Sequence, residues 1–471
     1  MSASRRPGGA AAATVAAINS AVRASNVRHL STLLATSRPL PPLTPPPLTL
    51  RATPTPIHLA TLSRTDAVNL LDTLVAAGAA VDADNGLGET PLHYAAFHGN
   101  PEAASFLLRL GANIHALSHA GSSPLFLAAQ QGRDELVRCF REDWGGDEGT
   151  RDRTGRTLLH VAAAAPWAGA ADGRGVDGGG EAIVGHCLDG RGMAVDVRDG
   201  RRRTPLFDAA TSGNLDGVRL LIARGADVHA VDVVGTTILH AAAKATRSEA
   251  IVTLLTEAAG ERPLDVRAVD RDGRTPLHIA ATGTDAATVR RLVSLGADVN
   301  ARSAGSVTPL MLAAGKAMNS RLPVLRALLA VHADPTLALA RASGVGNGLR
   351  ALEVALKARA YLAVAALATE GHAPIDSLSL DTLVRTRYTG TADERAAVTA
   401  VLDAVARPVA LSVRFPPHAN TLLHHAVAQH CVFLVQLIYD RFPSLASLPN
   451  AINVLPADYT TDATIRSILI R

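Results

Sequence analysis

Aromatic residues and cysteines are scarce in this chain of 471 residues. Aromatic residues make up 3% of the chain and only two of them are tryptophan, which leaves few rings for the stacking platforms of single-strand nucleic-acid binding proteins. The three cysteines, Cys139, Cys187 and Cys431, are odd in number and far apart, which argues against a disulfide framework. This cysteine usage predicts an intracellular, reducing compartment.

Sequence motifs of common enzyme classes are also missing. The chain has no His-Glu-x-x-His metalloprotease motif, no Gly-x-Ser-x-Gly nucleophile elbow and no kinase combination of glycine-rich loop, His-Arg-Asp and Asp-Phe-Gly. Its two glycine-rich stretches, 168–181 and 344–348, lack the preceding strand and the Gly-Lys-Ser/Thr ending of a phosphate-binding loop. We therefore expect no enzyme activity and no cofactor.

What the chain contains instead is one motif that recurs along most of its length. The sequence Thr-Pro-Leu-His-Tyr-Ala-Ala at 90–96 returns as Thr-Pro-Leu-His-Ile-Ala-Ala at 275–281. All copies share a threonine or serine followed five residues later by alanine, and they begin at Thr55, Thr90, Ser123, Thr157, Thr204, Thr237, Thr275, Thr308 and Thr421. From Thr55 to Thr308 the steps are 33 to 38 residues, apart from one of 47. Such a period indicates a stacked-repeat array with insertions in loops.

Each copy resembles the ankyrin repeat, in which Thr-Pro-Leu-His-x-Ala opens the first of two short helices. Threonine caps the helix, proline has φ already fixed, and the glycine that ends the second helix, such as Gly225, adopts a left-handed conformation at little cost. The resemblance implies an all-α solenoid of helix–turn–helix units with short β-hairpin fingers. We expect about 11 to 13 units, including degenerate caps.

The repeat register divides the chain into five parts. They are a disordered N-terminal tip (1–12), a degenerate N-capping repeat (13–38), a proline-rich connector (39–54), the main ankyrin-repeat array (55–340, with a glycine-rich insertion at 168–181) and degenerate C-terminal repeats with a cap (341–471). In the last part Arg350 and Glu353 replace the threonine and histidine of the motif, a weaker unit begins at Asp381, and Leu455 opens a partial repeat. Terminal repeats are expected to be atypical because their outer faces meet solvent.

Histidine is frequent, with 17 copies, but its positions favour a structural role. Six histidines occupy the fourth position of the motif: His58, His93, His160, His240, His278 and His424. Other copies have Phe126, Phe207 or Met311 there, which a catalytic role would not tolerate. In the resembling family this histidine hydrogen-bonds backbone groups that join neighbouring repeats.

A zinc site near the C-terminus is the main alternative for histidine. His424, His425, His430 and Cys431 are close in sequence, but only His424 and Cys431, seven residues apart, share a helical face. Structural zinc requires four ligands, and the motif already uses His424. We therefore expect no metal.

The N-terminal sequence allows two interpretations of the protein's cellular compartment. The first 65 residues contain arginine but no aspartate or glutamate, which is typical of a mitochondrial transit peptide. Because Ala21 to Leu34 keeps the repeat spacing, we favour a tip followed by a capping repeat, and a cytoplasmic or nuclear location. The apolar run 349–369 is interrupted by Lys357 and Arg359, so no membrane span is expected. The alternative interpretation of the proline-rich stretch is that it serves as a proline-motif ligand.

Charge differs between the predicted fingers, which in ankyrin-like arrays carry the variable, contact-making residues. The segments 82–89 and 227–236 are acidic, and two successive fingers between them are basic. The candidate partner-binding residues are the arginines of these two fingers: Arg151, Arg153, Arg156, Arg198, Arg201, Arg202 and Arg203. Arginine binds carboxylate and phosphate groups through two parallel hydrogen bonds. The alternative is a solvated turn whose charges aid solubility.

The favoured function is that of a non-enzymatic scaffold or adaptor, monomeric, that binds other proteins, including acidic or phosphorylated segments, through the concave face and the fingers. One alternative is the substrate-recognition subunit of a ubiquitin ligase, although the tail 444–471 resembles a capping repeat rather than an F-box, BTB or SOCS segment. Another is a nucleic-acid-associated regulator, prompted by a pI of about 9.2. A net charge of only +4 disfavours it, so nucleic acid is not an expected partner.

Overall fold

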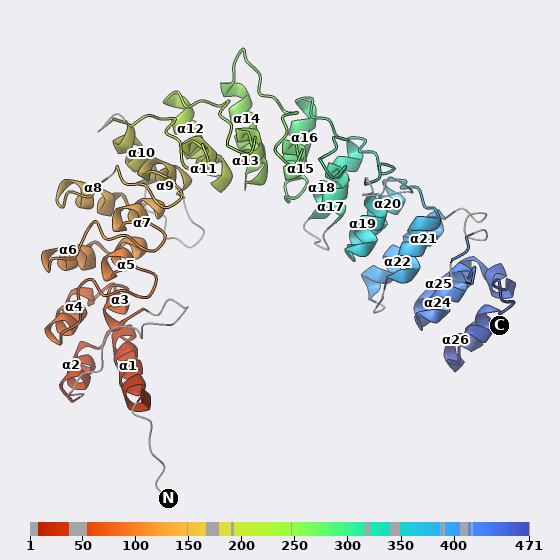
Figure 1. Cartoon of the computed structure of the whole chain (residues 1–471), viewed down its shortest axis with the longest axis horizontal. Helices are drawn as coiled ribbons and strands as arrows, with labels where there is room; N and C mark the ends of the chain where they lie inside the picture. Colours follow the sequence, from red (N-terminus) through yellow and green to blue (C-terminus); the bar gives the residue numbers. More distant parts are fainter. Residues whose placement is uncertain are drawn as a thin grey trace, which may run out of the picture. The chain divides into compact units, whose positions relative to one another are not determined.

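The computed structural model of the chain describes residues 8–36, 54–147, 149–165, 179–189, 193–245, 247–315, 321–339, 349–386, 388, 391–405, 413–415 and 418–470. The predicted tip before residue 8, the proline-rich connector up to residue 53, the glycine-rich insertion up to residue 178 and the stretch 341–348 lie outside them. The chain divides into two compact units, Met1–Val233 and Val234–Arg471. Each unit consists of pairs of short helices (Figure 1).

In the first unit, the first helices of the pairs form one row and the second helices another (Figure 1). The first helices are α1 (Gly8–Arg23), α3 (Pro56–Ala60), α5 (Pro91–His98), α7 (Pro124–Gln130), α9 (Leu158–Ala164) and α11 (Pro205–Ser212). The second helices are α2 (Val27–Thr36), α4 (Ala67–Ala76), α6 (Pro101–Arg109), α8 (Asp134–Glu142), α10 (Gly179–Asp189) and α12 (Leu215–Ala223). Helix α9 ends at Ala164 and α10 begins at Gly179, so the last residues of the predicted insertion 168–181 are helical.

The second unit continues the same alternation. Its first helices are α13 (Ile238–Lys244), α15 (Pro276–Ala280), α17 (Pro309–Ala314), α19 (Ala351–Lys357), α21 (Ser377–Arg385), α24 (Leu422–Ala428) and the 3₁₀ turn η3 (Pro456–Tyr459). Its second helices are α14 (Ser248–Ala258), α16 (Ala286–Ser294), α18 (Leu322–Ala330), α20 (Tyr361–Thr369), α22 (Ala392–Ala404), α25 (Val432–Arg441) and α26 (Ala463–Leu469), with the turn η2 (Pro443–Ser447) after α25.

The motif residues start and stop the helices as the sequence predicts. Thr90 is extended (φ −95°, ψ 168°) at the N-cap of α5, and Pro91 occupies the first helical turn. Gly99 ends the helix in the left-handed region at φ 70°, where a residue with a Cβ would be strained. Leu92, Ala95 and Ala96 are fully buried between neighbouring helices, and the small alanines allow those helices to pack closely.

Where the motif histidine is present, it joins its repeat to the next. In His93, Nδ1 accepts hydrogen bonds from the backbone N–H and the hydroxyl of Thr90, and Nε2 lies 3.0 Å from the carbonyl oxygen of Ser122. Because Nδ1 accepts from a backbone N–H, the proton must be on Nε2, which donates to the carbonyl. The other five motif histidines bind the carbonyls of Glu89, Arg203, Arg274, Val307 and Val454 at 2.9 to 3.0 Å. The predicted structural role is confirmed.

The fingers are hydrogen-bonded turns that precede each first helix. In the finger 152–156, the N–H of Asp152 donates to the carbonyl of Arg156. Successive fingers are joined as well: Arg153 donates to the carbonyl of Ala120, and Gly200 donates to that of Thr154. Instead of the expected β-hairpins, the described parts of the chain contain no named strand, and an isolated bridge joins Phe415 and Asn420.

Two predicted boundaries at the degenerate ends need correction. Helix α1 begins at Gly8, so residues 8–12, assigned above to a disordered tip, are helical, and their alanines favour this conformation. The unit expected to begin at Asp381 begins earlier, because Asp376 caps α21 by accepting hydrogen bonds from the N–H groups of Leu378 and Ser379. Asp381 lies within that helix. At the C-terminus, Leu455 caps η3 and α26 follows, so the predicted partial repeat is present.

Glu353 performs the histidine's task in the repeat that begins at Arg350. Its carboxylate is fully buried and accepts a hydrogen bond of 2.8 Å from the backbone N–H of Arg350. The other carboxylate oxygen accepts the hydroxyl of Ser379, in the next repeat. The Arg350 guanidinium lies 3.4 Å from Glu353 and 2.7 Å from Asp376. The Arg350–Glu353 ion pair therefore takes the place of the neutral imidazole. The carboxylate keeps both links, one to the backbone of the helix cap and one to the next repeat.

No described helix combines the length and apolar character needed to cross a membrane.

Acid should weaken the repeat stack. Burial lowers the pKa of His58 to about 4 and also lowers the pKa of His93, His160, His278 and His424. An unfolded histidine has a pKa of about 6.5, so below that pH the unfolded chain binds protons that the folded chain excludes. Stability from these histidines is present above about pH 6.5 and falls toward pH 4, by about 1.4 kcal/mol per pH unit for each histidine still neutral. Urea midpoints measured from pH 7.5 to 4.5 should fall, and a constant midpoint would contradict this prediction.

Removing the carboxylate of Glu353 should destabilise the second unit. The substitution Glu353→Ala leaves Ser379 and the Arg350 N–H without their acceptor, and breaking a buried ion pair costs about 3 kcal/mol. The double substitution Arg350→Thr with Glu353→His restores the motif and should recover most of that loss. Urea unfolding of the three chains tests this prediction, and equal stability of Glu353→Ala and the unchanged chain would refute it.

Candidate functional site

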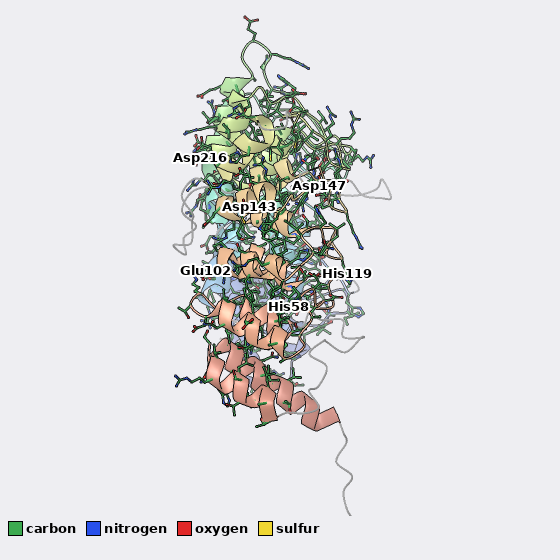
Figure 2. The ribbon with its side chains drawn as sticks, turned by 90° about the vertical axis from the view of Figure 1, so that its left-hand side faces the viewer. His58, Glu102, His119, Asp143, Asp147 and Asp216 are labelled. Carbon is green, nitrogen blue, oxygen red and sulfur yellow. The ribbon has the colours of Figure 1, made fainter. Side chains whose placement is uncertain are left out.

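The fingers and the second helices lie on opposite sides of the first unit. In Figure 2, Glu102 of α6 and Asp216 of α12 lie on one side of the ribbon, and His119 of a finger lies on the other. The side chains available for recognition beside the first helices are therefore those of the fingers and of the exposed first-helix positions. We call this surface the finger face.

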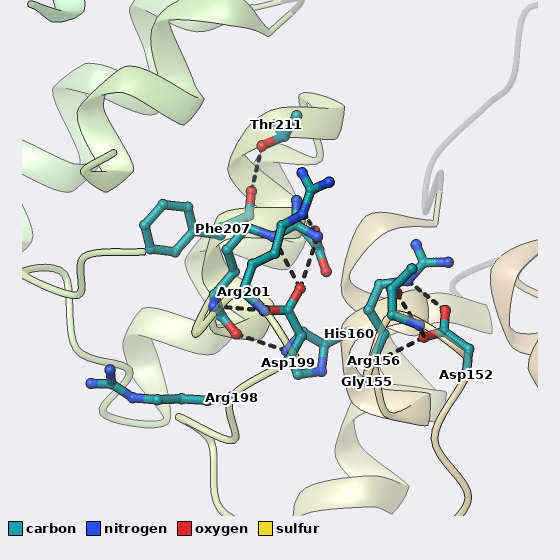
Figure 3. Close-up of polar contacts among 12 residues, drawn as sticks. Asp152, Gly155, Arg156, His160, Arg198, Asp199, Arg201, Phe207 and Thr211 are labelled. Atoms are coloured by element: carbon teal, nitrogen blue, oxygen red, sulfur yellow. Dashed lines mark hydrogen bonds and ion pairs between the residues drawn. The ribbon is translucent and has the colours of Figure 1, made fainter. Parts of the chain in front are cut away.

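Two of the seven candidate arginines are held within their own fingers. The Arg156 guanidinium lies 2.8 Å from the Asp152 carboxylate, and that of Arg203 lies 2.8 Å from Asp199 (Figure 3). These aspartates are almost fully buried and also accept backbone N–H bonds in the turn, and the paired guanidinium contributes to holding the pKa of each below its usual range. The same pairing recurs as Arg274 with Asp270 in a finger outside the candidate set. This pairing therefore belongs to the finger's internal structure.

A third candidate, Arg151, links the two basic fingers to each other. Its Nη1 donates to the carbonyl of Gly155 at 2.7 Å and to that of Arg198 at 2.9 Å. This side chain fixes the spacing of the fingers and leaves its other guanidinium hydrogens exposed to solvent. It therefore combines a structural task with an accessible charge.

The remaining four arginines are exposed: Arg153, Arg198, Arg201 and Arg202. None of them forms an ion pair with another residue that the structure describes. In Figure 3 the Arg198 side chain extends away from the ion-paired cluster. The two fingers thus present four exposed charged groups that have no ion-pair partner among the described residues.

Arg202 has an unusual backbone conformation. Its φ is 62°, in the left-handed region, and the matching positions of other fingers are held by Gly121, Gly155 and Gly273. A residue with a Cβ pays about 1 to 2 kcal/mol for this conformation. Ser306 and Asn453 have the same conformation at the matching positions of two other fingers, so this strain belongs to the finger turn.

A buried carboxylate that the sequence analysis missed lies beside this cluster. Asp208 of α11 is 8% exposed, and its Oδ1 lies 3.7 Å from the Arg203 guanidinium. Its Oδ2 accepts no hydrogen bond from any residue in the described parts of the chain. Burial raises the pKa of Asp208 to about 6, although the charges of Arg203 and Arg156 oppose the shift. One signal was available, because Tyr94, Leu127 and Val161 occupy this position in earlier repeats.

The repeat that contains Asp208 also lacks the motif histidine. Phe207 occupies that position, and the Thr204 hydroxyl is buried without a hydrogen-bond partner among the residues described. In repeats that have both the threonine and the histidine, the threonine hydroxyl pairs with Nδ1 of the histidine. The repeat of α11 therefore has two buried polar atoms, the Thr204 hydroxyl oxygen and Oδ2 of Asp208, without a hydrogen-bond partner among the described residues.

The histidine cluster near the C-terminus has no metal-site geometry. Within the described residues, no group of three or more His, Cys, Asp and Glu side chains is placed to hold a metal ion. Both ring nitrogens of His424 are engaged, Nδ1 with Thr421 and Nε2 with the carbonyl of Val454. The Cys431 thiol has a pKa raised by burial, which disfavours the thiolate that zinc would need.

Stacked helix pairs joined by imidazoles, with fingers that differ in sequence, define a helical-repeat protein. The chain matches the family described as Ankyrin repeats (3 copies) at residues 24–118, 178–263, 206–303 and 254–338. These matches cover more than half of the chain, and the protein belongs to the ankyrin-repeat family. The predicted solenoid class is thereby confirmed. Ankyrin repeats are typically protein–protein interaction modules and are generally non-catalytic.

Similar proteins share part of their length with this chain. It is 30% identical to the mouse B-cell lymphoma 3 protein homolog over 196 residues, which is 40% of each chain. It is 27% identical to mouse Rabankyrin-5 over 188 residues, 37% of this chain and 15% of that protein. The match to human Rabankyrin-5 is 27% over 181 residues, 36% of this chain and 14% of the relative. The chain thus spans well under half the length of these relatives.

Neutralising Asp208 should stabilise the protein above pH 6. The folded state holds this carboxyl with a pKa of about 6 against an unfolded value near 3.9, so ionisation costs stability at neutral pH, and that cost disappears as the pH falls from 6 toward 4. We expect Asp208→Asn to raise the free energy of unfolding by on the order of 2 kcal/mol at pH 7.5 and to have little effect near pH 4. The exposed Asp216→Asn serves as the control. A destabilised Asp208→Asn at pH 7.5 would refute the prediction.

Proposed function

We propose that this protein is a non-enzymatic scaffold or adaptor that binds an acidic or phosphorylated segment of a partner protein through the two basic fingers of its first unit. The observation that carries the proposal is the set of four exposed arginines, Arg153, Arg198, Arg201 and Arg202, that the fold leaves without ion pairs among the described residues. A guanidinium group offers planar, paired donors that match a carboxylate or a phosphate.

The arrangement of the two fingers favours a ligand with several negative charges. Arg151 connects the fingers through the carbonyl of Arg198, so the exposed arginines of both project from one hydrogen-bonded element. Ordered donors bind an anionic segment with less loss of side-chain and loop freedom than mobile ones. A single carboxylate carries one negative charge, whereas a phosphate or a run of acidic residues offers more charge and more acceptor oxygens to several guanidinium groups.

The structural arginines contribute in a different way. Arg156 and Arg203 hold the turns through Asp152 and Asp199, which neutralise most of their charge. Their substitution would disturb the finger itself, so a clean test of binding must leave them in place. The exposed residues Arg198, Arg201 and Arg202 provide that test.

Charge reversal at the exposed positions should abolish recognition without unfolding the protein. We expect the triple variant Arg198→Glu, Arg201→Glu, Arg202→Glu to bind a glutamate-run or phosphoserine-run peptide at least about tenfold more weakly, with an unchanged melting temperature. Fluorescence anisotropy of labelled peptides at low and physiological salt measures this effect, and a lysine-run peptide provides the comparison.

The matched control reverses three exposed arginines on second helices of the same unit: Arg109→Glu, Arg138→Glu and Arg219→Glu. This variant has the same change in net charge and should keep the affinity of the unchanged chain for the acidic peptides. Equal affinity of the finger variant and the control variant, or no preference of the unchanged chain for acidic over lysine peptides, would overturn the proposal.

A further inference from the structure

A second part of the finger face has the opposite chemistry. From residue 65 to residue 108 the chain contains six acidic residues and no lysine or arginine, and three of the six, Asp82, Asp84 and Glu89, lie in the finger before α5. Within this stretch and the turn before it, three large apolar side chains are exposed: Leu62 at 40%, Leu87 at 43% and Phe97 at 41%. Exposed apolar side chains are ordinary when scattered, but grouped ones mark interaction surfaces.

Hydrogen bonds and ring contacts place Leu62, Tyr94 and Phe97 near one another. The Asn100 amide, three residues after Phe97, donates to the carbonyls of Thr61 and Ser63 on either side of Leu62. The Phe97 ring lies 5.1 Å from the His98 ring, centroid to centroid, and Tyr94 lies 6.1 Å from His98. Leu62, Phe97 and Tyr94 therefore surround the end of α5 and the turn after α3.

Hydrogen bonds within the finger hold the acidic side chains of this surface in place. The buried Asn85 amide donates to the Glu89 carboxylate at 2.7 Å and to the Tyr94 hydroxyl at 3.3 Å, so the carboxylate lies next to the tyrosine. Asp84 closes the same finger by accepting the N–H groups of Gly86 and Gly88. Glu89 is half-buried and forms no ion pair with a described residue, so its charge is available to a ligand.

The charges around the surface also set the direction of a ligand. Arg133 of the next repeat packs against Gly99, at the end of the surface near Phe97, where a Cβ on Gly99 would meet its guanidinium at 2.6 Å. A cationic ligand group would be repelled at that end and attracted at Glu89, at the finger end. The apolar group of the ligand would then lie over Phe97 and Leu62.

We propose that Leu62, Leu87, Glu89, Tyr94 and Phe97 form an apolar–acidic docking site for a partner segment in which a large apolar side chain stands close to an arginine. The apolar side chain packs on Phe97 and Leu62, and the guanidinium lies on the Tyr94 ring and pairs with Glu89. This site is separate from the basic fingers and selects ligands of opposite charge. Its occupant is chosen on charge complementarity, because the finger before α5 carries Asp82, Asp84 and Glu89 and no lysine or arginine.

Selection from a phage-displayed library of random peptides on the full chain tests the proposal. The enriched peptides should carry a large apolar residue near an arginine or lysine and few acidic residues. Synthetic versions should bind Phe97→Ser at least about tenfold more weakly and Glu89→Gln about three- to tenfold more weakly, with melting temperatures unchanged. The glutamine keeps the acceptor for Asn85 while removing the charge.

Matched controls separate this site from general effects and from the basic fingers. Val269→Ser removes an apolar side chain that is 56% exposed from the second unit, and Glu102→Gln removes an exposed carboxylate from α6 of the same repeat. Both should bind the peptides as the unchanged chain does, and so should the arginine-finger variant. Failure to enrich peptides, enrichment of acidic or purely apolar ones, or equal binding to Phe97→Ser would overturn the docking site, while leaving the test of the arginine fingers unaffected.

Discussion

The structure depends on one interaction, the imidazole that connects a helix cap to the backbone of the following repeat. His93 shows its chemistry: Nδ1 accepts from Thr90, and Nε2 donates to Ser122. A neutral ring satisfies both ends, and a protonated ring could not accept from the cap. Glu353 solves the same problem with a carboxylate, a salt-bridged arginine and a serine from the next repeat. Where a polar side chain occupies this position it makes two connected polar links, and histidine makes them without burying a charge.

Because the motif positions are used to build the stack, recognition depends on residues that the stack does not need. In the first unit these residues fall into two groups of opposite chemistry. The fingers before α9 and α11 have exposed arginines, whereas α5 and its finger combine aromatic and aliphatic side chains with Glu89. Asp208 lies beside the basic group, and one of its carboxylate oxygens accepts no hydrogen bond from a described residue.

Much of this architecture follows from the sequence, because the motif specifies its own cap, helix start and partner contacts. The helix pairs, the six structural histidines and the final partial repeat were predictable for that reason. The start of α21 was not, because Asp376 and Ser379 form a cap with no threonine or proline to mark it. Sequence alone also could not separate the arginines: Arg156 and Arg203 face buried aspartates of their own turns, which depends on finger geometry. The role of the exposed arginines in binding stays a prediction.

The central claim is that the motif histidines are neutral links with the proton on Nε2, so that they serve the scaffold and leave recognition to the finger face. Nitrogen NMR of the chain labelled with ¹⁵N-histidine, from pH 7.5 to 5, tests this claim most directly. The account predicts that His58, His93, His160, His278 and His424 keep the signature of the neutral Nε2–H tautomer below pH 6, because burial lowers the pKa of each. If these rings protonate with midpoints near 6.5, as an unperturbed histidine does, the account is contradicted.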